Sequence, residues 1–192
     1  MYIANNIYLC YINITAPALF GKMVSTLVTS GLTANQERRL IELLDKVKQP
    51  YSAELFEALA RRLPVIGLEA VVLREFDGRL EVLMTARPDN DLIAKWARKW
   101  HIPGTILRNA ETIEDGFFRL GEREFGATLV NIRFVYLHFP RGGDRSSNLQ
   151  LVHVADIAES QPCLGTWFDV EKLPNDLISG HCQIIREVVR RR

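Results

Sequence analysis

The sequence lacks the features that mark several classes of protein. It has only three cysteines, Cys10, Cys163 and Cys182, whose wide separation suits neither a disulfide framework nor a zinc site. Its formal net charge is +1, so no field of one sign favours nucleic acid or an anionic membrane. No apolar run reaches the roughly 18 to 20 residues of a membrane-spanning helix. We therefore expect a cytoplasmic protein with reduced thiols and no nucleic-acid or membrane partner.

The first 22 residues form an N-terminal extension with no basic residue before Lys22. They therefore lack the charged start of a secretory signal. Three interpretations are open: a β-rich extension, a poorly ordered tail, or sequence upstream of a natural start at Met23. None of them assigns chemistry to this segment.

Residues 23–63 are expected to form a short helical arm. Thr33 and Gln36 make a capping box, and apolar residues then recur at helical spacing over residues 34–48. Ser52 is placed to cap a second helix that ends before Pro64. Basic and acidic side chains are balanced along the arm, which argues against a DNA-reading helix-turn-helix. We interpret the arm as a packing segment, and a homodimer is the assembly it would suit.

Residues 64–192 read as one mixed domain. An Asp77-Gly78 turn separates two predicted strands, residues 66–74 and 80–85, and further strands are expected over 128–138, 149–155 and from Gly165. A final amphipathic helix is expected over residues 176–191. Strands with one internal and one terminal helix predict an α/β fold with a mixed sheet between helices.

The most specific pattern lies between Pro103 and Ala127, where a turn and a short apolar stretch precede an acidic helix start. Its order and spacing resemble the Nudix box, G-x5-E-x7-R-E-U-x-E-E-x-G-U with U aliphatic. Thr105 stands at the first glycine position, and the other matches are Glu111, Arg119, Glu124 and Gly126. The resemblance extends over about residues 64–192 and implies a Nudix-type α/β/α sandwich behind the helical arm. It also implies structural roles in the box for Gly104, Glu111, Arg119 and Gly126.

The resemblance implies a Mg²⁺-dependent hydrolase of a nucleoside diphosphate linked to another moiety, with a nucleotide sugar as one candidate and Mn²⁺ as an alternative ion. Mg²⁺ prefers oxygen ligands and leaves room for substrate phosphates. Glutamates normally stand at the positions of Leu120, Arg123 and Glu124, of which Glu124 alone is kept. The implied metal ligands are therefore Glu124, the carbonyl of Thr105 and, from a later loop, Asp144. Glu124 and Glu122 are the implied catalytic acids.

The departures from the box resemble those of GDP-mannose mannosyl hydrolase, which also has leucine after the arginine. In that branch an arginine corresponding to Arg87 contacts the diphosphate. Arg108 and Arg123 are the other predicted phosphate contacts, because a guanidinium binds phosphate directly.

Two alternatives remain. Asp115, Arg119 and Arg123 are spaced four apart, as in a surface charge ladder. The chain is alternatively a catalytically silent module that binds or senses a nucleotide derivative.

Overall fold

The computed structural model describes residues 31–91, 94–140, 148–158 and 163–192. It divides into two units, Met1–Lys48 and Gln49–Arg192, and each is described by itself. In the first unit, α2 (Ala34–Leu44) begins at the predicted capping box, with the Thr33 hydroxyl accepting from Gln36 N–H. The helix ends earlier than the predicted residue 48. The expectations for residues 1–22 concern a segment outside the described ranges.

The second unit begins with α3 (Ala53–Ala60), whose predicted cap is confirmed because the Ser52 hydroxyl accepts from Leu55 N–H. The predicted domain boundary at residue 64 places α3 in the arm, and that boundary stays a prediction. The strands are β1 (Val65–Phe76), β2 (Arg79–Ala86), β3 (Trp100–His101), β4 (Gly104–Ile106), β5 (Leu129–His138), β6 (Asn148–Ile157) and β7 (Thr166–Asp169). A short 3-10 turn, η2 (Ala94–Trp96), precedes β3.

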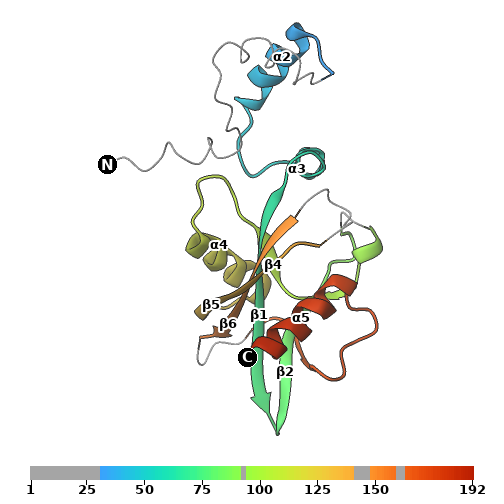
Figure 1. The fold of residues 1–192 in the computed structure, drawn as a ribbon, viewed down its shortest axis with the longest axis vertical. Coiled ribbons are helices and arrows are strands. Elements are labelled where there is room, and N and C mark those ends of the chain that lie inside the picture. Colours follow the sequence, from blue (N-terminus) through green and yellow to red (C-terminus); the bar gives the residue numbers. More distant parts are fainter. Residues whose placement is uncertain (1–30, 92–93, 141–147, 159–162) are drawn as a thin grey trace, which may run out of the picture. The chain divides into compact units, whose positions relative to one another are not determined.

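The β1–β2 hairpin turns at Asp77-Gly78 as predicted. Both residues have positive φ, 50° and 71°, which is the backbone that a two-residue hairpin of the favoured twist requires. Across the hairpin, Phe76 on β1 pairs with Arg79 on β2, and Arg74 pairs with Glu81. The hairpin strands β1 and β2 are neighbours in the sheet, and β1, with 12 residues, lies at its centre (Figure 1).

The sheet is mixed, as predicted. Its order is β3-β2-β1-β6-β5, while β4 pairs with β1 and β7 pairs with β2. β1 and β6 run parallel, and the other pairings are antiparallel. The long strand β1 therefore contacts β2, β4 and β6, and β4 brings the box segment against the centre of the sheet.

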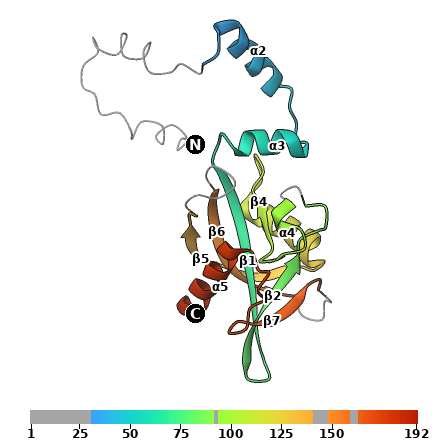
Figure 2. The same ribbon diagram turned by 90° about the vertical axis from the view of Figure 1, so that its right-hand side faces the viewer.

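Helices cover both faces of the sheet (Figures 1 and 2). On one face α4 (Ile113–Leu120) packs through Phe117 and Leu120 against Leu68 and Ala70. On the other, α5 (Ser179–Arg191) packs through Ile184, Ile185 and Val188 against Val71, Val82 and Met84. Leu68 and Ala70 alternate with Val71 because successive strand residues point to opposite faces. The arrangement confirms the predicted α/β/α sandwich.

The C-terminal helix starts at Ser179, later than the predicted residue 176. Residues 174–178 make a turn first, in which Leu177 N–H donates to the Pro174 carbonyl. Among the described residues, no helix combines the length and apolar content that crossing a membrane requires.

Candidate functional site

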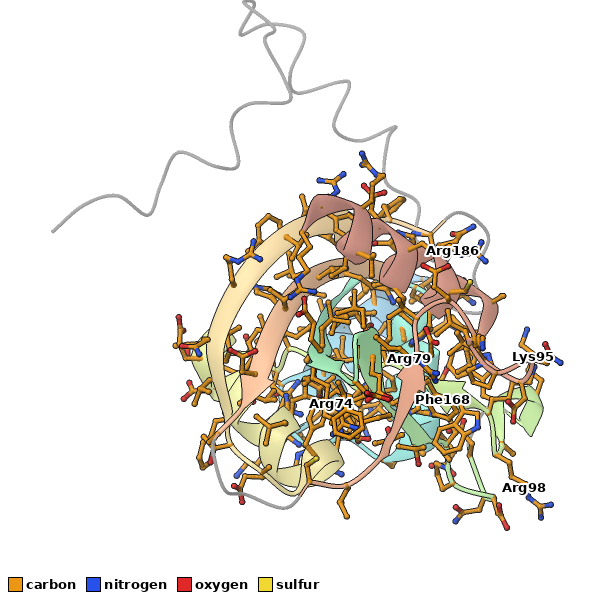
Figure 3. The ribbon with its side chains drawn as sticks, turned by 90° about the horizontal axis from the view of Figure 1, so that it is seen from below. Arg74, Arg79, Lys95, Arg98, Phe168 and Arg186 are labelled. Atoms are coloured by element: carbon orange, nitrogen blue, oxygen red, sulfur yellow. The ribbon has the colours of Figure 1, made fainter. Side chains whose placement is uncertain are left out.

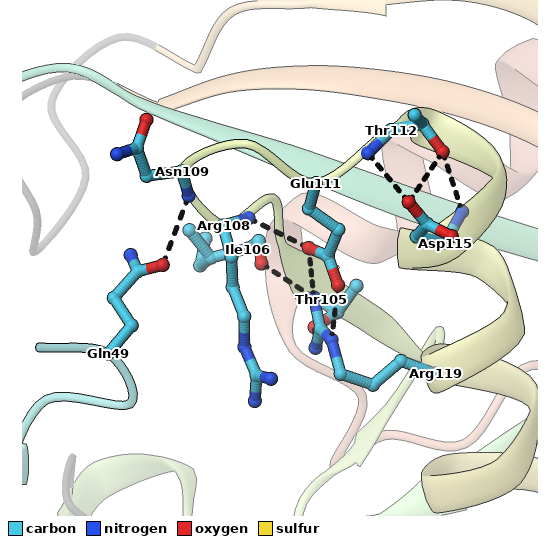
Figure 4. Close-up of polar contacts among 9 residues, drawn as sticks. All are labelled: Gln49, Thr105, Ile106, Arg108, Asn109, Glu111, Thr112, Asp115 and Arg119. Carbon is cyan, nitrogen blue, oxygen red and sulfur yellow. Dashed lines mark hydrogen bonds and ion pairs between the residues drawn. The ribbon is translucent and has the colours of Figure 1, made fainter.

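Arg119 on α4 fastens the start of the box segment to β4 (Figure 4). Its Nε and Nη2 donate to the two carboxylate oxygens of Glu111 at 2.7 and 2.8 Å. Its other donations go to the Thr105 hydroxyl and, at 3.0 Å, to the Ile106 carbonyl. The Glu111 carboxylate also accepts from Arg108 N–H at 2.8 Å. The Arg119 guanidinium thus joins helix α4 to strand β4 and to Glu111 in the loop between them. We call this set of contacts the Arg119 lock.

The lock keeps Glu111 ionised. The hydrogen bonds from Arg119, more than any other contact, lower the pKa of Glu111 to about 2. The side chains of Arg119 and Glu111 are only 15% and 11% exposed, so the pair is largely shielded from solvent. Paired charges that are this well hydrogen-bonded tolerate burial, whereas a single one does not.

The helix itself starts at Thr112, not at Glu111. Thr112 and Asp115 form a capping box in which the Asp115 carboxylate accepts from Thr112 N–H at 3.1 Å and the Thr112 hydroxyl accepts from Asp115 N–H at 3.1 Å (Figure 4). Asp115 therefore caps the helix, and Arg119 forms its ion pair with Glu111. The surface-ladder interpretation, which pairs Asp115 with Arg119, is wrong.

After Leu120 the helix widens into a π turn, η3 (Gly121–Phe125), which ends at Gly126 with φ 61°. In such a turn the backbone hydrogen bonds join residues five apart. Leu120, just before the turn, and Phe125, at its end, are both buried. Leu120 is 1% exposed and packs with Phe117 in the core, while Glu124 is partly exposed. Leu120 and Glu124, which stand at two glutamate positions of the Nudix-box pattern, therefore have different surroundings: the first lies in the core and the second reaches solvent.

A cleft with a volume of about 750 Å³ opens beside β4, and many of the predicted site residues line it. Predicted site residues on its wall are Arg87, Gly104, Thr105, Arg108, Arg119 and Arg123. Glu122 and Glu124, on η3, are not among its lining residues in the described part of the chain. The structure thus brings the predicted phosphate contacts and the Thr105 backbone together, without the two glutamates.

Aromatic and apolar side chains line the rest of the cleft. They come from α3 and the residues around it, from η2 and from the start of α5: Tyr51, Phe56, Leu59, Leu63, Trp96 and Ile178. Sequence reasoning missed α3 as part of a site, because its apolar side chains are equally typical of plain packing. A cleft with cationic and aromatic walls suits a ligand that has an anionic and a ring portion.

Two histidines form a neutral polar wall of the cleft. His101 Nδ1 donates to the Ile102 carbonyl at 2.8 Å, and Ile102 N–H donates to His181 Nδ1 at 2.9 Å. Burial lowers the pKa of His101 to about 4 and that of His181 to about 3. Both imidazoles are therefore uncharged near neutral pH, and the cationic character of the cleft comes from arginine.

Glu69 is the site residue that the sequence did not reveal. It lies on β1, lines the cleft and is 8% exposed. Its Oε1 accepts from Gln150 Nε2 at 3.0 Å, and burial raises its pKa to about 8. The available signal was a single acidic residue inside the apolar run of residues 65–73.

Comparison with known structures identifies the architecture. No protein-family model and no curated protein sequence matches the chain. Solved structures do match. The NUDIX domain of Shewanella oneidensis NrtR, in complex with ADP ribose, has 18% identity and a TM-score of 0.56 over 74% of this chain and 94% of its own. A MutT/nudix family protein from Enterococcus faecalis has 16% identity and a TM-score of 0.56 over 93% and 74%. This chain has the Nudix fold.

A third solved structure, of an Ap4A hydrolase of C. elegans, is 12% identical with a TM-score of 0.51, over 66% of this chain and 96% of its own. At such identities the likeness concerns the fold, and the chemistry depends on the residues of this chain. Of the residues that match the Nudix-box pattern, Glu111 and Arg119 form the Arg119 lock and Gly126 ends the π turn.

The residues present do not fit a preformed Mg²⁺ site. The described residues contain no group of three or more His, Cys, Asp or Glu side chains placed to hold a metal ion. A core leucine fills one glutamate position of the Nudix box, and Arg123 brings a positive charge to another. Asp144, the predicted loop ligand, lies outside the described residues. Glu124 and the Thr105 carbonyl stay predictions as metal ligands.

Proposed function

We propose that this chain binds a nucleoside diphosphate derivative in the cleft. The observation that carries the proposal is the group of arginines on its wall. Arg119 is engaged by Glu111, and Arg87 is engaged by Asp91 at 2.6 Å. The guanidinium groups of Arg108 and Arg123 make no hydrogen bond or ion pair with other described residues. Guanidinium groups bind phosphate oxygens through paired hydrogen bonds.

The rest of the cleft suits the remainder of such a ligand. Aromatic side chains of Tyr51, Phe56 and Trp96 provide surface on which a flat ring can pack. The two neutral histidines give the wall polarity without adding charge; both ring nitrogens of His101 are engaged, by Thr85 and Ile102, and His181 Nδ1 accepts from Ile102 N–H. The NrtR domain of the same fold was solved with ADP ribose, and this compound is the probe we choose for binding.

Hydrolysis of the bound compound is the second candidate function. It is supported by the spacing of the Nudix box and by Glu124, which stands at the end of α4 on η3. The leucine of the box, as in GDP-mannose mannosyl hydrolase, makes a nucleotide sugar the preferred candidate substrate. Because the described residues do not assemble a metal site, we derive no metal-dependent step for this chain.

Calorimetry with ADP-ribose tests the binding proposal. We expect the Arg108→Ala, Arg123→Ala double variant to weaken binding by about tenfold or more, because two charge-assisted contacts are lost. Arg98→Ala is the matched control, since Arg98 pairs with Asp89 and is not among the described lining residues of the cleft. Equal affinity in the double variant and the control would contradict the proposal, as would absence of binding to ADP-ribose, ADP and GDP-mannose alike.

Product analysis separates binding from hydrolysis. ADP-ribose, Ap4A and GDP-mannose are incubated with the protein, with and without Mg²⁺ or Mn²⁺, and the products are resolved by chromatography. If the chain is a hydrolase, Glu124→Gln lowers the rate by on the order of a hundredfold. If compounds bind and none is cleaved in any condition, the hydrolase candidate fails and the binding function stands.

A further inference from the structure

The Glu69 carboxyl lies in the cleft floor and forms no ion pair with another described residue. β1 places it opposite Gly104 on β4 and beside Val152 on β6. Its Oε1 accepts from Gln150, whereas Oε2 is buried with no hydrogen-bond partner among the described residues. An unsatisfied buried polar group has lost its water without gaining a partner, so this carboxyl destabilises the fold on its own. Such a cost is typical of a group kept for binding.

Gly104 makes the space for this carboxyl. A Cβ added at Gly104 would overlap the Glu69 carboxyl group. Any other residue at position 104 would therefore have to displace the Glu69 side chain. Gly104 is needed here for the space that it leaves and not for a turn, because its φ is not positive.

Gln150 extends the hydrogen-bonding capacity of the floor. One of its amide hydrogens goes to Glu69, while the second hydrogen and the carbonyl oxygen have no partner among the described residues. Both side chains line the cleft. The amide of Gln150 and the carboxyl of Glu69 thus place a donor and acceptors side by side, while Oε2 itself is enclosed beside Gly104. Rotation about the broad terminal torsion of Glu69 exchanges its two oxygens, so either one can face a ligand.

We propose that the Glu69–Gln150 pair selects the ligand of this cleft by hydrogen-bonding the edge of a nucleobase. The inference rests on the proposed function, since it needs a nucleotide in the cleft. A nucleobase has adjacent donors and acceptors on its edge and apolar faces above and below. The cleft offers the matching surroundings, a polar floor with apolar walls that include Ile102 and Ile178.

Glu69 acts in this role as a neutral acid. Burial raises its pKa to about 8, against the smaller opposing effects of Gln150 and of the positive charge of Arg87 beyond β2. The other titratable groups near it are uncharged near pH 7: His101 on β3, His181 on α5 and Tyr136 on β5, whose pKa is raised. A neutral carboxyl donates through its O–H and accepts through its carbonyl oxygen, which is also the pattern of a glutamine amide.

The test compares five nucleoside diphosphates that share the diphosphate and differ in the base: ADP, IDP, GDP, CDP and UDP. ADP and IDP are the informative pair, because a carbonyl replaces the amino group and the order of donor and acceptor is inverted. Calorimetry at about pH 6.5 should show a preference of about tenfold or more for one base in the natural protein. Glu69→Leu should reduce the preference to within about twofold, and Glu69→Gln should retain it.

Further variants keep the inference testable if Glu69→Leu does not fold. Gln150→Leu and Gly104→Ala each disturb the pair from a different strand and should reduce the preference as well. Arg108→Ala should weaken all five ligands by the same factor and leave their ratios unchanged. Melting temperatures of the ligand-free variants establish that each is folded.

The outcomes distinguish this inference from the proposed function. If the five diphosphates bind with equal affinity, or if Glu69→Leu and Gln150→Leu leave the preference intact, the pair is not selective and the binding function still stands. Loss of the preference in Glu69→Gln overturns the neutral-acid role. If none of the five binds and ADP-ribose does not bind either, the proposed function itself fails.

Discussion

Glu69 and Glu111 are two shielded carboxyls, of which Glu69 is neutral and Glu111 is ionised near pH 7. Both act close to β4: Glu69 faces Gly104, while Glu111 holds the arginine that binds Thr105 and Ile106. Burial raises the pKa of Glu69 to about 8 despite the more distant positive charge of Arg87, and the hydrogen bonds from Arg119 lower the pKa of Glu111 to about 2. Depth alone therefore does not decide the charge of a carboxyl; the partner does.

The difference separates two tasks in one short stretch of the fold. The charged pair fixes the box segment to the sheet, and the neutral carboxyl remains available to a ligand. Substitutions at either carboxyl or at its partner should therefore have different effects on stability, and replacement of the partner of Glu111 should have the largest.

Replacing the cation of the lock should have the largest effect. Arg119→Met leaves Glu111 shielded without its partner and breaks four hydrogen bonds. We expect a loss of about 3 kcal/mol in the free energy of unfolding, because a buried charge is left unpaired. Differential scanning calorimetry should show a melting temperature lower by roughly 6–12 °C.

The control for this change is Arg98→Ala. Arg98 forms an ion pair with Asp89 in which both side chains are more than 70% exposed, and Figure 3 shows Arg98 at the periphery of the domain. Exposed pairs contribute about 0–1 kcal/mol, so little change is expected. Equal melting temperatures for Arg119→Met and Arg98→Ala would show that the lock is not stabilising.

Making Glu69 permanently neutral should have the next largest effect. Its folded-state pKa is raised to about 8 from the model-peptide value of 4.5, so the folded state holds the proton more tightly than the unfolded state. Stability of the natural protein then falls as pH rises from about 4.5 to about 8. Glu69→Gln should be more stable by up to about 3 kcal/mol at neutral pH and should lack this decline. Parallel denaturant titrations at several pH values test it; a decline of the same slope in both proteins would contradict the assignment.

Glu111→Gln should change the acid side of the stability profile. A carboxyl whose folded-state pKa is lowered to about 2 contributes stability above its unfolded pKa of about 4.5, and this stability is lost as pH falls toward 2. We expect the difference in unfolding free energy between the natural protein and the variant to shrink by about 1 kcal/mol between about pH 5 and pH 3. A difference that is constant with pH would mean that Glu111 is not ionised in the lock.

The smallest expected effect is the coupling between Gly104 and Glu69. Gly104→Ala should destabilise the natural protein by about 1 kcal/mol, because the new methyl group displaces the carboxyl. In a Glu69→Ala background the same change should be nearly neutral, giving a coupling energy of about 0.5–1 kcal/mol. Additive effects in thermal melts would show that the two residues do not compete for space.

The sequence predicted the sheet and the two covering helices because these depend on local patterns. The apolar run along β1, the alternation of apolar residues along β5, the Asp77-Gly78 turn and the helical spacing in α5 each follow from a few neighbouring side chains. The lock was within reach as well, since Glu111 and Arg119 are eight residues apart in a known spacing. The cleft floor was not, because Gly104 and Gln150 approach Glu69 only through pairing of strands far apart in the chain.

The π turn after Leu120 was not predicted, for a different reason. Spacing alone does not reveal whether a helical turn has α or π hydrogen bonds. The packing that accompanies the π turn is visible only in the structure, where Leu120 before it and Phe125 at its end are both buried.

The π turn also sets how this segment tolerates changes in length. A π turn contains one residue more than an α-helical turn, so deleting one residue between Leu120 and Gly126 can be absorbed by restoring ordinary helical hydrogen bonds. A deletion within Ile113–Leu120 has no such reserve and would rotate the buried residues out of the core. We therefore expect length variants of this helix to be recovered at its C-terminal end, with the surviving glutamate facing a new direction.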